Sequence, residues 1–319
     1  MGCVSSKNLD DNEVSSRGFS VKSKPGSGGF NNKISEKDSK GFVGDTLKYP
    51  MPANEYDGDR FALQHYLFRY IWQSNFSSPI EEKLSTDGTR VLDVGIGTGS
   101  WVLEMAKEYP NTKFTGVDHR SLFNKNTPSN VDVKHTDSIL SLPFDDNTFD
   151  FVFMRFLAQE ITEEKFEHIL IPELTRVLKP GGYLEIMDLD AQCGNEGPAA
   201  QTLMSAVRTH YQSKGINPIM TSKLKRFMSS TKMLVDINVE EEIHPLGSWD
   251  EKIGEIALTD WLMVLNNLKM GIAPLLNINE DEYRDLLRSF KDETDIFQTY
   301  WASTRVYGKK TSAPDSQPS

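Results

Sequence analysis

The chain has 319 residues and a formal net charge of -11, with 38% hydrophobic and 10% aromatic residues. This apolar content is enough for a substantial core, and the acidic balance argues against binding of nucleic acid through clustered Lys and Arg. The two cysteines, Cys3 and Cys193, lie far apart in the sequence, so we expect no disulfide framework and no Cys/His metal site. No apolar run of about 18 residues is present, so we expect no transmembrane helix.

The first 45 residues differ in composition from the rest of the chain. They are rich in Ser, Gly, Lys, Asn and Asp, and the run KPGSGG at residues 24–29 is typical of linkers. Because such a segment buries too little apolar surface to offset its ordering entropy, we expect a disordered arm over residues 1–45. Residues 46–319 are expected to form one domain, with a core over about 88–190, a helical cap and final strands over about 190–308, and a frayed polar tail over 309–319.

Hydrophobic periodicity predicts the elements of this domain in chain order. Apolar residues at helical spacing predict a helix from Arg60 to Trp72. Strand and helix patterns then alternate, which implies a mostly parallel sheet covered on both faces. The predicted strands cover residues 90–94, 113–117, 131–135, 149–154, 183–187, 236–244 and 297–307, and the predicted helices that follow the first cover residues 100–109, 163–178, 198–213, 251–270 and 280–291.

A glycine-rich turn follows the first predicted strand, in VLDVGIGTGSW at residues 91–101. Gly95, Gly97 and Gly99 allow the backbone to approach a ligand closely, and the helix that begins after them offers free N–H groups. The spacing is G-x-G-x-G, which differs from the dinucleotide-binding pattern G-x-G-x-x-G. Taken alone, such a turn could also be a purely structural connection between a strand and a helix.

Acidic residues follow three successive strands. Asp93 lies in the end of the first strand, Asp118 ends the second, and Asp137 follows the third. Since the carboxyl ends of parallel strands meet at one edge of the sheet, we expect the three side chains near the glycine turn. Asp118 could accept hydrogen bonds from both hydroxyls of a ribose. Asp137 could accept a bond from the amine of an adenine, or could simply form a turn.

These motifs, followed by FDFVFMR at residues 149–155 and LKPGGYLEIMD at residues 178–188, resemble class I methyltransferases that depend on S-adenosylmethionine (SAM). The resemblance covers Leu47 to Tyr307. The lead-in YPMPANEYDGDRFALQHYLFRYIW at residues 49–72 is similar to a fungal group that includes regulators of secondary metabolism and small-molecule methyltransferases. The resemblance implies an α/β, Rossmann-like seven-strand sheet with an antiparallel last strand, a helical cap and SAM as the cofactor.

The resemblance also implies a cofactor site, built from residues at or after the ends of the first four strands: Asp93, Gly95, Gly97, Gly99, Asp118, His119, Asp137, Ser138 and Arg155. The glycines would line the methionine part of SAM, and the first acid would help to hold its amino group. The second acid and the adjacent histidine would bind the ribose, the third acid and the serine would frame adenine, and the arginine would face the cofactor or the acceptor. Tyr49 and Arg60 would cover the site as a lid, although Arg60 could equally lie on a solvated helix face.

The function implied is methyl transfer to an unidentified small acceptor, which we expect to be hydrophobic or membrane-associated. A SAM-binding regulator with little turnover, acting through protein partners, and a protein methyltransferase stay open as alternatives. The sequence shows no metal-ligand set, and no base is assigned, although four histidines are candidates by type: His119, His168, His210 and His244. Six residues could line an apolar acceptor pocket or could belong to the ordinary core: Met204, Tyr211, Met220, Phe227, Trp261 and Met263.

The sequence begins with MGCVSSK, which matches the myristoylation pattern M-G-x-x-x-[ST] with Gly2 and Ser6. It resembles the dual-acylated start of Src-type kinases and G-protein α subunits. The resemblance implies a myristoyl group on Gly2, a palmitoyl group on Cys3 and attachment to the cytoplasmic face of a membrane. A cytosolic protein with a chance match to so short a pattern is the alternative.

Overall fold

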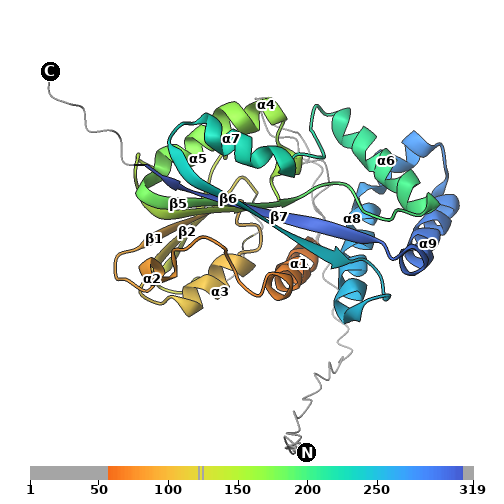
Figure 1. Cartoon of the computed structure of the whole chain (residues 1–319), viewed down its shortest axis with the longest axis horizontal. Helices are drawn as coiled ribbons and strands as arrows, with labels where there is room; N and C mark the ends of the chain where they lie inside the picture. Colours follow the sequence, from red (N-terminus) through yellow and green to blue (C-terminus); the bar gives the residue numbers. More distant parts are fainter. Residues whose placement is uncertain (1–56, 121–122, 124–125, 312–319) are drawn as a thin grey trace, which may run out of the picture. The chain divides into compact units, whose positions relative to one another are not determined.

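The computed structural model describes residues 57–120, 123 and 126–311, and these residues include a seven-stranded sheet (Figure 1). The strand order is β3-β2-β1-β4-β5-β7-β6, in which β1 to β5 are parallel and β7 runs antiparallel to both of its neighbours. This is the sheet that the sequence predicts. The strands are β1 (Arg90–Val94), β2 (Lys113–Asp118), β3 (Val131–His135), β4 (Phe149–Arg155), β5 (Leu178–Leu189), β6 (Leu234–Pro245) and β7 (Tyr300–Lys310).

The central strands are apolar along almost their whole length because both faces of the sheet are covered. In β4, FDFVFMR, every residue before Arg155 is buried. One face packs against α2 (Glu81–Leu84) and α3 (Ser100–Glu108), where the ring of Trp101 stacks on Phe153 with centroids 4.0 Å apart. The other face packs against α4 (Glu163–Lys165), α5 (Ile171–Val177) and α7 (Leu224–Ser230).

Four further helices form a cap with a hydrophobic cluster of its own. The cluster joins Phe68, Trp261 and Trp301, whose rings pack edge to face. No helix in the described ranges is both long and apolar enough to cross a membrane. The cap helices are α1 (Asp57–Ile71), α6 (Pro198–Gln212), α8 (Glu251–Leu276) and α9 (Glu280–Phe297).

The segment that follows α1 is tied firmly to the sheet. The buried carboxylate of Glu185 on β5 accepts hydrogen bonds from the backbone N–H groups of Ser77 and Ser78 and from the Ser78 hydroxyl, at 2.6–3.0 Å. Arg305 on β7 donates to the hydroxyl and the carbonyl of Ser74 at 2.8 and 2.9 Å. Glu185 and Arg305 also form an ion pair, with Nε and Oε1 3.8 Å apart, so the end of α1 is anchored on the two strands.

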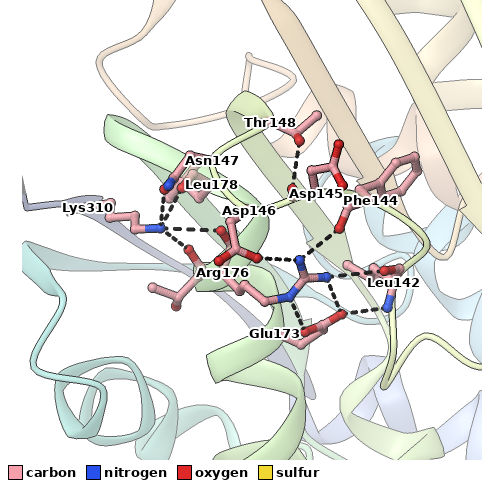
Figure 2. A network of polar contacts seen from close by, with 11 residues as sticks. Leu142, Phe144, Asp145, Asp146, Asn147, Thr148, Glu173, Arg176, Leu178 and Lys310 are labelled. Atoms are coloured by element: carbon pink, nitrogen blue, oxygen red, sulfur yellow. Dashed lines mark hydrogen bonds and ion pairs between the residues drawn. The ribbon is translucent and has the colours of Figure 1, made fainter.

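A network of hydrogen bonds at the amino-terminal ends of the parallel strands stabilises the fold (Figure 2). Arg176 in α5 donates to the Glu173 carboxylate at 2.8 Å and to Asp146 at 2.7 Å. The buried ammonium group of Lys310 donates to the carbonyls of Thr175 and Leu178, both at 2.7 Å. These bonds satisfy carbonyls at the end of α5 that lack a partner within the helix, and they fix that end beside β7.

Several element boundaries differ from the sequence prediction. The helix predicted over 163–178 is interrupted by a π-helical turn, η2 (Phe166–Leu170), which lies just before Pro172. Proline has no N–H to donate to the preceding turn, so the helix widens there. Strand β5 begins at Leu178, five residues earlier than predicted, α8 continues to Leu276, and α7 was not predicted. Strand β7 extends to Lys310, past the expected start of the tail, and the expected arm lies outside the described residues.

Candidate functional site

The connection between β1 and α3 is a turn whose backbone requires glycine. Gly95, Gly97 and Gly99 have φ of +78°, +54° and +77°, in the left-handed region that L-residues with a side chain rarely adopt. The N–H groups of Gly95 and Ile96 both donate to the carbonyl of Val117, at 2.8 and 3.0 Å, which ties the turn to β2. A Cβ atom built on Gly97 would meet nothing within 4 Å. The backbone of Gly97 therefore borders open space, as a ligand cradle does.

Asp118, at the end of β2, holds this turn. Its Oδ2 accepts a hydrogen bond from the N–H of Gly97 at 2.9 Å, and its Oδ1 accepts one from the N–H of Arg120 at 2.8 Å. Nδ1 of His119 lies 3.5 Å from the same Oδ1. Burial lowers the pKa of His119 and so favours the neutral ring, while the charge of Asp118 opposes this change. The two residues predicted at the ribose thus lie together, beside the glycine turn.

Asp93 and Arg155 carry opposite charges that interact at the carboxyl ends of the adjacent strands β1 and β4; Asp93 is buried and Arg155 is half-buried. Burial raises the pKa of Asp93 to about 7, and the charge of Arg155 opposes this rise. Burial also lowers the pKa of Arg155 to about 10, and the negative charge of Asp93 opposes this fall. Arg155 lines the pocket described below, and Asp93 is not among its lining residues. The predicted pair is therefore close to the turn, with the arginine nearer to any ligand.

Asp137 and Ser138 do not line the pocket. Asp137 is exposed, and Ser138 takes part in a local turn in which its carbonyl accepts from the Thr136 hydroxyl at 3.0 Å. Its own hydroxyl oxygen accepts from the N–H of Leu140 at 3.1 Å. Their predicted role at adenine stays a prediction. These bonds show a local turn made by Thr136 and Ser138, whereas the turn-forming role that the sequence left open was that of Asp137.

One pocket joins the glycine turn to the cap. The space free of protein atoms within it is about 1120 Å³, a volume that includes open solvent at its mouth. The turn and the ends of β4 and β5 form one side, and α1, α6 and α8 form the other. Its walls include Gly95, Ile96, Gly97, Thr98, Ser100, Arg120, Arg155, Phe156, Leu157, Gln159, Glu160, Asp188, Leu189 and Ala191, and from the cap and β7 Arg60, Phe61, Gln64, Val207, Tyr211, Asp260, Trp261, Val264, Leu265, Leu268 and Trp301.

The cap side of the pocket combines apolar walls with one buried charge pair. Arg60 is 2% exposed, so it is not on a solvated helix face, and its Nη1 lies 3.7 Å from Oδ1 of Asp260. Burial raises the pKa of Asp260 to about 6, and Arg60 opposes the rise. The indole N–H groups of Trp261 and Trp301 are buried and find no acceptor among the described residues. This side therefore offers two hydrogen-bond donors and a carboxylate within an apolar enclosure.

The sequence predictions for the acceptor side are confirmed only in part. Tyr211 and Trp261 line the pocket, whereas four of the six candidates do not: Met204, Met220, Phe227 and Met263. Met220 and Phe227 belong to the core on the face of the sheet that α5 and α7 cover. None of the four candidate histidines lines the pocket; His168 is exposed, and His244 is buried with its Nε2 3.0 Å from the Ser303 hydroxyl. The predicted lid residue Tyr49 lies outside the described residues.

Four charged residues of the site were not predicted: Arg120, Glu160, Asp188 and Asp260. Asp188 closes the motif LEIMD at the end of β5, so an acid at the carboxyl end of a strand could have signalled it. Arg120 follows Asp118 by two residues. Glu160 lies in the short turn η1 (Ala158–Glu160) and Asp260 lies within α8, and neither position carries a recognisable motif.

The residues present fit SAM as a ligand. The open side of Gly97, the carboxylate of Asp118 and the acids of the wall suit a molecule with a ribose and positive charges. A metal centre has no such support, because the described part of the chain contains no cluster of three or more metal-ligating side chains. The turn is therefore the place where a nucleoside-containing cofactor can approach the backbone.

Comparisons with known proteins agree on the domain. Residues 91–182 match a family model described as a methyltransferase domain. Methyltransferase str3 of Strobilurus tenacellus is 25% identical over 166 residues, which make up 51% of this chain and 59% of that protein. Secondary metabolism regulator laeA of Coprinopsis cinerea is 31% identical over 146 residues, or 44% of this chain and 36% of that protein. The chain thus spans less than two thirds of either relative.

Among solved structures, phosphoethanolamine N-methyltransferase 2 of Haemonchus contortus, in complex with S-adenosyl-L-methionine, is similar with a TM-score of 0.46 and 19% identity. The match covers 79% of this chain and 57% of that one. Residues 91–182 thus match a methyltransferase domain. They lie within a seven-stranded, mostly parallel sheet with a glycine turn after β1, as the resemblance of the sequence to class I methyltransferases implies.

Proposed function

We propose that this protein transfers the methyl group of SAM to a small acceptor that has a mainly apolar body and one polar group. One observation carries the proposal: a single pocket runs from the glycine turn to a cap lined by apolar side chains of α6 and α8. A cofactor on the turn and an acceptor under the cap would share one enclosure. Proximity and alignment of the two reactants can supply much of the rate enhancement in such a reaction.

The side chains of this pocket have distinct tasks in the proposed reaction. Bound SAM supplies an activated methyl group. Asp118 and the turn orient the cofactor, and Phe61 on α1 narrows the mouth between Arg60 and Arg120, whose guanidinium carbons lie 4.4 and 5.7 Å from its ring centre. The apolar walls contributed by α8 exclude water from the acceptor.

The acceptor's polar group is best matched by the cap residues. The indole N–H groups of Trp261 and Trp301 can donate to an oxygen of the acceptor, and the carboxylate of Asp260 can take up a proton from a hydroxyl or attract a positive charge. Buried donors without acceptors cost stability, so a ligand that satisfies them gains affinity. This chemistry favours a small molecule over a protein substrate, because the two donors are buried among apolar side chains.

The test is a transfer assay with SAM labelled in its methyl group, incubated with the full chain and a cell extract, and then separated by size. We expect label in the small-molecule fraction and none in the protein fraction. Label in protein would support protein methylation instead. If the protein binds SAM but transfers no label, the result would support a regulator with little turnover. The similarity to laeA makes this the second candidate function.

We also propose that the chain is attached to a cytoplasmic membrane face through a myristoyl group on Gly2 and a palmitoyl group on Cys3. The support is the motif MGCVSSK, which lies outside the described residues. One myristoyl chain gives only marginal binding, of about 10⁴ M⁻¹, and the acidic chain would be repelled by anionic lipids. A second acyl chain on the neighbouring thiol would provide stable attachment.

A further inference from the structure

Glu160 is a buried carboxyl group in the wall of the cofactor pocket, and no role has yet been given to it. It is 5% exposed and ends the short turn η1 after β4. Its Oε1 lies 3.5 Å from Nη2 of Arg120. Its Oε2 is buried and accepts no hydrogen bond from any described residue. An oxygen in this state has unused capacity to bind a ligand.

Two neighbouring acids, in contrast, already accept hydrogen bonds from the backbone. Asp188 accepts from the N–H groups of Ala158 and Leu189, at 2.8 and 2.9 Å, and Asp118 accepts from two backbone N–H groups of the turn region. Backbone donors stabilise the ionised form of a carboxyl group. Glu160 lacks these donors, so it is the acid of this group whose protonation responds most to what fills the pocket.

Burial favours the protonated form of Glu160 in the free protein. Burial raises its pKa to about 8, Arg120 opposes this rise, and Asp118 and Asp188 add to it. A positive charge brought into the same enclosure favours the carboxylate, and a neutral ligand does not. SAM carries a sulfonium cation, whereas the sulfur of the product S-adenosylhomocysteine (SAH) is neutral.

We propose that Glu160 loses its proton when SAM binds but not when SAH binds, and that its carboxylate strengthens the binding of SAM relative to that of SAH. In this step the O–H bond of the Glu160 carboxyl group breaks and the proton passes to the solvent. The bonds of the cofactor are unchanged. The inference rests on SAM as the cofactor of the proposed function. It assigns to Glu160 an interaction that distinguishes the substrate SAM from the product SAH.

The experiment is calorimetric titration of the full chain with SAM and with SAH at pH 7, in phosphate and in Tris buffer. The two buffers take up protons with different enthalpies, so the difference in observed heat counts the protons released. We expect roughly one more proton to be released with SAM than with SAH. Equal release for both ligands overturns the inference, and this comparison needs no variant.

Two variants assign the proton to a residue. E160Q keeps the shape of the side chain but cannot ionise; we expect the SAM-specific proton release to disappear and the preference for SAM over SAH to fall about tenfold. The matched control E164Q makes the same change on the exposed surface of α4 and should behave as the original chain does. If E160Q releases as many protons as the original chain, the inference is wrong although SAM binds. If the original chain binds neither ligand, the proposed function fails as well.

Discussion

At the scale of single residues, Asp118 holds the glycine turn, and we expect the same carboxylate to bind the ligand. Its two oxygens accept the N–H groups of Gly97 and Arg120, and the residue is 3% exposed. Each oxygen keeps a further lone pair for a ribose hydroxyl. The same side chain therefore shapes the turn before the cofactor arrives and can bind the cofactor afterwards.

The substitution Asp118→Ala should weaken SAM binding by roughly 1.5–3 kcal/mol, about ten- to hundredfold, because it removes ribose hydrogen bonds and the support of Gly97. Calorimetric titration with SAM measures the change. Asp118→Asn is the control, since its amide oxygen still accepts from Gly97, and it should lose less affinity than the alanine variant. An unchanged dissociation constant in the alanine variant would contradict the assignment.

At the scale of elements, the unit formed by β1, the glycine turn and α3 follows closely from local sequence. An apolar strand, three glycines and a helical pattern are adjacent in the chain, so their order determines the geometry. Glu160 and Asp260 are different, because they reach the turn only through the packing of η1 and α8. The residues next to these two acids in the sequence form no motif that indicates their position near the turn. Periodicity predicts only whether each acid is buried or exposed.

The same distinction explains the errors at element boundaries. The predicted end of a helix at residue 178 is close to the observed end of α5 at Val177, but the run KPGG that follows, at residues 179–182, is already part of β5, as extended backbone beside β4. Pairing across the sheet overrides a local preference for a turn there. Short α7 escapes prediction since seven residues show too little periodicity to be distinguished from a loop.

The glycine turn allows a test with a matched control. Gly97→Val places a branched side chain in the open space beside the backbone, so SAM binding should be lost while the fold persists. The left-handed φ adds a strain of about 1–3 kcal/mol. Gly88→Val carries the same kind of strain, with φ of +82° and nothing within 4 Å of the added atom, but it lies in an exposed turn before β1. Thermal unfolding should show similar losses for both, and titration should show lost SAM binding for Gly97→Val alone.

At the scale of the whole molecule, the buried acids make stability depend on pH in an unusual direction. Burial raises the pKa of Asp93 and Asp188 to about 7 and that of Glu160 to about 8. The same groups are already ionised in the unfolded chain above about pH 5. Between about pH 6.5 and pH 8.5 the folded chain therefore binds more protons than the unfolded chain, and its free energy of unfolding falls as pH rises.

We expect the melting temperature of the ligand-free protein to fall between about pH 6.5 and pH 8.5, as measured by calorimetry. In E160Q the fall should be smaller, because one of the three titrating groups is gone. Histidines do not account for such a trend, since the pKa of both His65 and His244 is lowered to about 4 and these rings are neutral throughout the range. A melting temperature that rises over this interval would show that the acids are ionised in the folded state.

Membrane attachment concerns the whole chain and is tested in cells that carry an N-myristoyltransferase. We expect the original chain in the membrane fraction, Gly2→Ala in the soluble fraction, and Cys3→Ser only loosely attached, because one acyl chain binds marginally. Mass spectrometry of the N-terminal peptide reports the modification directly. An unmodified Gly2 in a wholly soluble protein would disprove the membrane proposal and leave the methyltransferase proposal untouched.

The anchoring of α1 has a mechanical consequence. Its last turn leads into Ser74, Ser77 and Ser78. Hydrogen bonds with Glu185 and Arg305 hold these residues on the sheet, so this end of the helix is fixed. The other end of the helix carries Arg60, Phe61 and Gln64 in the pocket wall, and it is joined directly to the preceding chain. The helix therefore connects the fixed segment to the wall of the pocket. We therefore expect a displacement of the first turn of α1 to shift the pocket wall while the anchored end of the helix keeps its place.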